Sequence, residues 1–288
     1  MQRQIYHANI RYLTTCQLLN YLPIPFVLSK SRVCYFHSTC VRSTADGHAS
    51  DRRKSGLRVL FFGTDEFALE TLKLLHAELL LRQASPDGDS GCVADLAVVC
   101  AQMRTLVPAV TRYVTAQNLP LLHWPPPDLQ RGQFDVGVVA SFGHLIPGRI
   151  IDAFPRGILN VHGSLLPRWR GAAPIIHALR AGATQTGLTV MKIKAGRFDV
   201  GDILASEAVA VGEDERRTEL TQRMAEVGGS LLLTVLRDLE RFEAASRPQP
   251  LEGVSHAPAV DKSLAFIDFN SQGCDFDRIS RVYFYLNL

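Results

Sequence analysis

Several patterns that would assign this chain to a common class of protein are missing from its sequence. Its six cysteines include no CxxC pair, and a chain of 288 residues needs no disulfide staples, so reduced thiols are expected. Neither a GxGxxG phosphate loop nor a GxSxG nucleophile elbow occurs. The formal net charge of +3 neither requires nor excludes a nucleic-acid partner. The 47% hydrophobic content suffices for one sizeable α/β domain and a partial second region.

Acidic residues are absent from the start of the chain, where Asp46 is the first and five basic residues precede it. A basic, acid-free and partly apolar beginning is typical of a mitochondrial transit peptide, which we predict, with its linker, at residues 1–50. The alternative is a secretory signal or membrane anchor at 12–28. Pro23 and Pro25 interrupt that stretch, which is short for a spanning helix. We therefore expect import into the mitochondrial matrix and no membrane partner.

Short apolar runs alternate with helical patterns through residues 56–247, which we predict to be one catalytic domain. Strands are predicted at 58–62, 94–101, 119–122, 135–140, 158–162, 186–193 and 203–211. Helices are predicted after Asp65 and at 107–117, 174–182 and 213–242. This alternation favours an α/β fold with a mostly parallel sheet covered on both faces.

The stretch from Asn160 to Pro174 begins as a strand and continues as a loop. Alternation places Asn160 and His162 side by side on one face of the strand, and Leu159 and Val161 on the other. An amide and an imidazole in that arrangement can polarise a carbonyl oxygen, and the imidazole can also move a proton. We interpret this strand end as the centre of a catalytic site.

A later glycine-flanked loop supplies a carboxylate, Asp199, that can complete the site. If an acyl group moves to an amine, Asn160 and His162 can stabilise the oxyanion and Asp199 can accept the amine's proton. Each residue also has a structural alternative, since the amide can bond backbone, the imidazole can end a strand and the carboxylate can hold a turn. A metal site with Asp202 lacks a second His or Cys at ligand spacing, so no metal is expected.

The sequence from Asn160 to Pro174 resembles the Asn-x-His…Ser-Leu-Leu-Pro-x-x-Arg-Gly-Ala-Ala-Pro signature of the methionyl-tRNA formyltransferase family. Further similarity lies at 61–68, 142–147 and 198–202, and the resemblance spans about residues 57–247. It implies a Rossmann-like formyltransferase domain that uses 10-formyltetrahydrofolate to formylate methionyl-tRNA. It makes Asn160, His162 and Asp199 the catalytic trio. With the leader, it indicates the mitochondrial type.

The resemblance also implies binding roles for two loops. The folate-lining residues would be Phe142, Leu145, Ile146, Ser164, Leu165, Leu166 and Pro167. The first three have ordinary core packing as their alternative, and His144 between them is expected to face solvent. Arg168 and Arg170 are candidates for tRNA contact, with solvated loop arginines as the alternative.

Residues 248–288 are predicted to be a linker and the truncated start of a carboxyl-terminal tRNA-binding domain. If so, tRNA affinity would be weakened while the formyl-transfer centre stayed intact. Two other functions remain open at this point. One is formyl transfer to a small amine or hydrolysis of formyl-folate, and the other is an inactive remnant. A monomer is expected.

Overall fold

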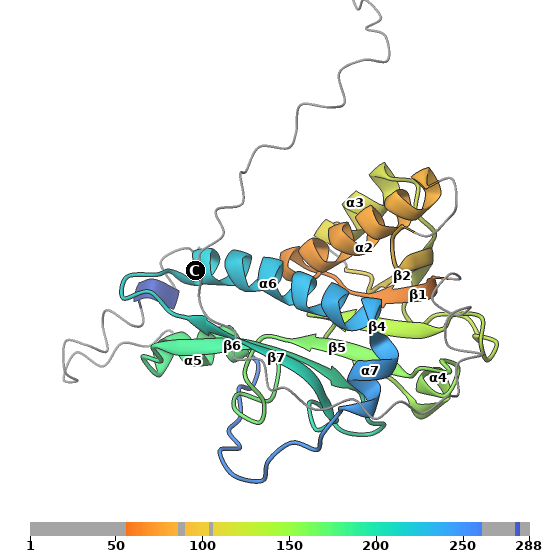
Figure 1. Ribbon diagram of the computed structural model, residues 1–288. Coiled ribbons are helices and arrows are strands. Elements are labelled where there is room, and N and C mark those ends of the chain that lie inside the picture. The colour runs from red at the N-terminus through yellow and green to blue at the C-terminus, as the bar shows by residue number, and fades with distance from the viewer. Residues whose placement is uncertain (1–55, 86–89, 104–105, 261–279, 283–288) are drawn as a thin grey trace, which may run out of the picture. The chain divides into compact units, whose positions relative to one another are not determined.

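The computed structural model describes residues 56–85, 90–103, 106–260 and 280–282, so the predicted leader and most of the tail lie outside it. Within these ranges the strands form a seven-stranded sheet of order β3-β2-β1-β4-β5-β6-β7 (Figure 1). The strands are β1 Leu57–Phe62, β2 Val93–Cys100, β3 Leu121–His123, β4 Val136–Ala140, β5 Ile158–His162, β6 Gln185–Lys192 and β7 Ile203–Ala210. Strands β1 to β5 pair in parallel, and β6 pairs antiparallel with both β5 and β7. The predicted Rossmann-like α/β fold with a mostly parallel sheet is confirmed.

Helices α2, α3 and α6 lie on one face of the sheet (Figure 1). The helices are α2 Glu66–Ala84, α3 Ala109–Ala116, α4 Gly148–Ile151, α5 Pro174–Arg180, α6 Arg217–Arg237 and α7 Leu239–Ala244. The Asp65 carboxylate caps α2 by accepting the N–H of Ala68, while Leu72 and Leu75 are fully buried on its inner side. Leu159 and Val161 of β5 point into the same core.

The opposite face has a smaller core beside β1 and β4. Phe62 lies at its centre and makes edge-to-face contacts with Phe142, Trp124 and Phe154. Ile158 belongs to this cluster, as does Ile150 of the short helix α4. Asn160 and His162 share this face with Ile158 by strand alternation, as the sequence predicts, and so lie on the face of the sheet away from α6.

The helix predicted at 213–242 is wrong in its bounds. It begins at Arg217, where the Glu219 carboxylate accepts the N–H of Arg216 at 2.9 Å, because Gly212 and Glu215 first close a turn. It is interrupted at Asp238, whose backbone (φ −139°, ψ 49°) is not helical, and α7 follows. The short helix α4 was not predicted. No helix in the described ranges is both long and apolar enough to cross a bilayer.

A buried carboxylate joins two helices and the sheet. Glu78 of α2 is 3% exposed, accepts a hydrogen bond from Arg237 of α6 at 2.6 Å and another from the N–H of Cys92 at 2.8 Å. Burial acts to raise the pKa of Glu78, but the bonds from Arg237 and Cys92 outweigh it, so this pKa lies below its ordinary value.

We predict that Glu78→Gln lowers the free energy of unfolding by about 1–3 kcal/mol at pH 7, because a charged acceptor with two donors is lost. A carboxylate with a lower pKa in the folded chain stabilises the fold above its ordinary pKa. That contribution is lost as the pH falls through the folded-state pKa. Urea unfolding should therefore show that the difference in the free energy of unfolding between the wild type and Glu78→Gln is present at pH 7 and disappears in the acid range. Glu70→Gln, at an exposed pair with Lys73, is the control; a difference independent of pH would contradict the assignment.

Candidate active site

The loop between β6 and β7 brings Asp199 to β5 from an unexpected direction. Strand β6 ends at Lys192, beside Leu159 at the start of β5, and yet Asp199 contacts His162 at the other end of β5. The loop therefore runs back along β5, over about 10 Å, on the face that carries Asn160 and His162. In an all-parallel sheet the loop after the neighbouring strand would already begin at the His162 end of β5, and no return along β5 would be needed.

Three polar side chains meet at this place, of which Asn160 is half-buried and the other two are buried. The Asp199 Oδ1 atom lies 3.3 Å from Asn160 Nδ2 and 3.6 Å from His162 Nδ1. Its Oδ2 atom accepts the N–H of Gly171 at 2.8 Å. Asp199 is 8% exposed and His162 is 6% exposed. The structure thus brings together the amide, the imidazole and the carboxylate that the sequence singled out.

The imidazole of His162 is held by its other nitrogen. Nε2 lies 3.0 Å from the carbonyl oxygen of Trp169, and a carbonyl can only accept a hydrogen bond, so Nε2 carries a hydrogen. The nitrogen that faces Asp199 is therefore the one that can gain or lose a proton. A proton at Nδ1 makes the ring an imidazolium directly opposed to a carboxylate.

Backbone strain is concentrated around the site. Among the described residues other than glycine, positive φ occurs at Asp199 (+52°), Trp169 (+60°), Ser141 (+39°) and Asn118 (+54°). The first three lie in the loops after β6, β5 and β4. Asp tolerates this region through local hydrogen bonds, but a bulky residue such as Trp is a true outlier, and such residues cluster at functional sites.

The residues predicted to line a folate site occupy different environments. Phe142 and Ile146 are buried in the second core, whereas Leu145 is 45% exposed. The Ser164 hydroxyl is fully buried and donates to the carbonyl of Arg168. Leu165 is half-buried, and Leu166 and Pro167 are buried. His144 is exposed and stacks on Trp124, as expected of a solvent-facing residue.

The two arginines predicted to contact tRNA differ in what they touch. Arg168 is exposed and lies 5.6 Å from the centre of the Trp169 ring. Arg170 is half-buried and donates twice to the side-chain oxygen of Gln249, at 3.0 and 2.6 Å. The guanidinium of Arg170 is therefore engaged within the chain.

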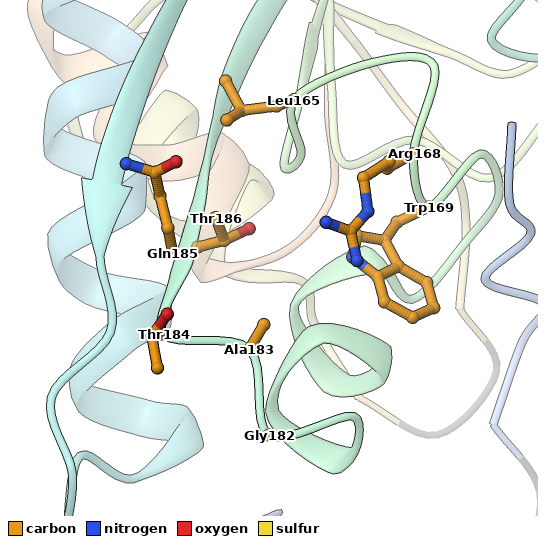
Figure 2. Close-up of a pocket in the computed structure, with 8 residues that line it drawn as sticks. All are labelled: Leu165, Arg168, Trp169, Gly182, Ala183, Thr184, Gln185 and Thr186. Atoms are coloured by element: carbon orange, nitrogen blue, oxygen red, sulfur yellow. The ribbon is translucent and has the colours of Figure 1, made fainter. Parts of the chain in front are cut away.

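A pocket of about 380 Å³ opens beside this loop (Figure 2). Its walls are the side chains of Arg168 and Trp169 on one side and the turn that leads into β6 on the other (Figure 2). Leu165 is the one proposed folate-lining residue among those that line it. Asn160, His162 and Asp199 are not among them, so the pocket adjoins the site without containing it.

The segment from Arg247 to Ala257 also lies against the site, and sequence reasoning missed it. Gln249 contacts both the Asp199 loop and Arg170, and Ser255 bonds the backbone of Trp169. Pro248 and Pro250 flank Gln249, so the composition indicated a linker. No local signal distinguished this glutamine.

Two further observations bear on cofactor chemistry. Within the described part of the chain, no group of three His, Cys, Asp or Glu side chains is arranged to hold a metal ion. Cys92 and Cys100 are free thiols. Burial and the nearby Glu78 raise the pKa of Cys92 to about 12, so its thiol is not a nucleophile at neutral pH.

Comparisons with known proteins identify the class of fold. Residues 127–236 match the Formyl transferase family. The fold is shared with a sugar 3N-formyltransferase, WlaRD, whose crystal structure was determined in the presence of dTDP and 5-N-formyl-THF. That likeness has a TM-score of 0.60 at 14% identity and covers 78% of each chain. The fold is thus that of the N-formyltransferases.

Relatives of higher identity narrow the class. The mitochondrial methionyl-tRNA formyltransferase of Rattus norvegicus is 40% identical over 86% of this chain and 63% of its own length. The methionyl-tRNA formyltransferase of Variovorax paradoxus is 40% identical over 74% of this chain and 69% of its own. The chain belongs to the methionyl-tRNA formyltransferase family. It spans about three fifths of the length of the mitochondrial relatives that it matches.

The close packing of Gly171 against the backbone of Ala257 should be essential to the site. Its φ is +126°, and an added Cβ would lie 2.5 Å from the carbonyl oxygen of Ala257. We predict that Gly171→Ala lowers the melting temperature clearly more than Gly143→Ala does. Gly143 also has a positive φ (+75°), but nothing lies within 4 Å of its added Cβ, so it controls for backbone strain. Equal decreases in a thermal melt would show that the approach of Ala257 does not matter.

Proposed function

We propose that the chain transfers the formyl group of 10-formyltetrahydrofolate to the amino group of methionyl-tRNA, in mitochondria and within the matrix. The observation that carries the proposal is that Asp199 contacts both Asn160 and His162, with Asp199 and His162 buried. Family membership supports the reaction class, and the names of the relatives supply the acceptor and the compartment.

The proposed chemistry needs no protein nucleophile, because the donor already carries an activated acyl group. The amine attacks the formyl carbon, and the C=O electrons move to oxygen to give a tetrahedral oxyanion. The Asn160 amide and the imidazolium of His162 donate hydrogen bonds to that oxygen. Asp199 takes a proton from the attacking nitrogen, directly or through water. As the carbonyl re-forms, the folate nitrogen leaves and receives that proton from Asp199, by the same direct or water-mediated route, which restores the carboxylate.

The low exposure of His162 and Asp199 strengthens their interactions with the reacting atoms. Charges interact more strongly where water is excluded, and donors already held in place need no reorganisation during the reaction. Donation from the Gly171 N–H fixes one Asp199 oxygen, which leaves the other facing Asn160 and His162. That oxygen is the proposed proton acceptor.

We place the substrates on either side of this trio. The loop after β4, with exposed Leu145 above buried Phe142 and Ile146, is the proposed folate side, together with the loop from Ser164 to Pro167. Exposed Arg168 remains a proposed tRNA contact. For Arg170 the hydrogen bonds to Gln249 favour an internal role instead.

Substitution of two members of the trio tests the mechanism. We predict that His162→Ala and Asp199→Asn each lower kcat by at least about a hundredfold, because oxyanion stabilisation or proton transfer is lost. Folate binding should persist. The measurements are transfer of labelled formyl to methionyl-tRNA and calorimetric titration with the folate. His123→Gln, on an exposed position of β3, is the control. Near-normal turnover in either variant would remove that residue from the chemistry.

The acceptor is tested separately, by incubating the protein and the formyl-folate with methionyl-tRNA, with a small primary amine, or with neither. We expect formyl-methionyl-tRNA as the main product. Product on the small amine alone, or release of formate alone, would overturn the proposed acceptor and favour one of the alternatives. Absence of any product would favour an inactive remnant.

A further inference from the structure

The segment from Arg247 to Ala257, here called the brace, touches two loops of the site from one side. At its start, Arg247 exchanges two backbone hydrogen bonds with Ile203, at 2.8 and 3.1 Å. Near its end, Ala257 donates to the carbonyl of Arg170 and accepts the N–H of Ala173, at 2.7 and 3.1 Å. The brace is therefore anchored at the base of the Asp199 loop and along the loop after β5.

Gln249 lies between these two attachment points, and both the nitrogen and the oxygen of its side-chain amide form hydrogen bonds. Its Nε2 donates to the carbonyl oxygens of Asp199 and Gly201, each at 2.9 Å. Its Oε1 accepts from Nε and Nη2 of Arg170, at 3.0 and 2.6 Å. An amide has two donor hydrogens and two acceptor lone pairs, so every one of them is occupied.

These contacts converge on one carboxylate by two routes. The carbonyl of Asp199 belongs to a residue in the left-handed region, and fixing that carbonyl fixes the direction in which the side chain leaves the backbone. Arg170 precedes Gly171, whose N–H holds Asp199 Oδ2. Gln249 thus joins the backbone of Asp199 to the loop that supplies a donor to its carboxylate.

We infer that Gln249 is a positioning residue for formyl transfer: it sets the orientation of the Asp199 carboxylate without touching either substrate. This inference rests on the function proposed above. A displacement of a reacting group by about 1 Å can lower a rate about a hundredfold, so a loosened Asp199 loop should lower kcat while substrate binding is kept.

Two substitutions distinguish the role of the amide's donor nitrogen from that of its acceptor oxygen. Gln249→Glu keeps an acceptor for Arg170 but removes the donors and faces two carbonyl oxygens with a carboxylate. Gln249→Ala removes both ends. For both variants we expect kcat to fall about 10- to 100-fold, with KM for formyl-folate and for methionyl-tRNA changed by less than about threefold. Glu252→Gln, an exposed position of the same segment, is the matched control and should behave as wild type.

A second measurement does not depend on activity. Amide hydrogen exchange, followed by mass spectrometry, should be at least about tenfold faster in peptides covering 196–202 of both Gln249 variants, and unchanged in peptides of α2. Equal acceleration in α2 would mean general destabilisation, and wild-type kcat and exchange in Gln249→Glu would mean that the donors do not matter. Either result overturns the inference. If the wild type itself does not formylate methionyl-tRNA, the proposed function fails, while the local exchange still decides whether Gln249 holds the loop.

Discussion

A carboxylate removed from water must be surrounded by donors, and Asp199 places this requirement on two parts of the chain, β5 and the loop that follows it. Left without partners, such a charge would cost several kcal/mol. Its donors are the Asn160 amide of β5 and the N–H of Gly171, and the imidazole of His162 lies 3.6 Å away. The antiparallel β6, the return of its loop along β5 and the left-handed backbone at residue 199 together make these contacts possible.

The strain near the site follows from the same constraint. Trp169 takes a positive φ while its carbonyl holds His162, and its N–H donates to Ser255. Both backbone groups of one outlying residue are thus committed, one to the imidazole and one to the brace. Strain of this kind costs of order 1–3 kcal/mol and persists only where neighbouring contacts hold the conformation in place. Here the contacts that hold it are also those that orient the histidine.

The sequence predicted the parallel strands because buried strands are continuously apolar, and it predicted the shared face of Asn160 and His162 because side chains alternate along a strand. It identified Asp199 as a candidate through chemistry and resemblance. The route by which Asp199 arrives was not readable, since strand direction depends on tertiary pairing. The interruption of α6 at Asp238 escaped prediction because its apolar periodicity continues on both sides.

Gln249 was missed for a different reason. A domain boundary is predicted from composition where apolar residues become scarce. The two prolines beside Gln249 meet that criterion. Backbone hydrogen bonding gives another answer, because Arg247, Ser255 and Ala257 pair with β7 and with the loop after β5. A polar segment can be integral to a site when its contribution is donors and acceptors rather than buried apolar area. For this chain, the residues that act with the site therefore extend to Ala257, ten residues past the boundary that composition suggests.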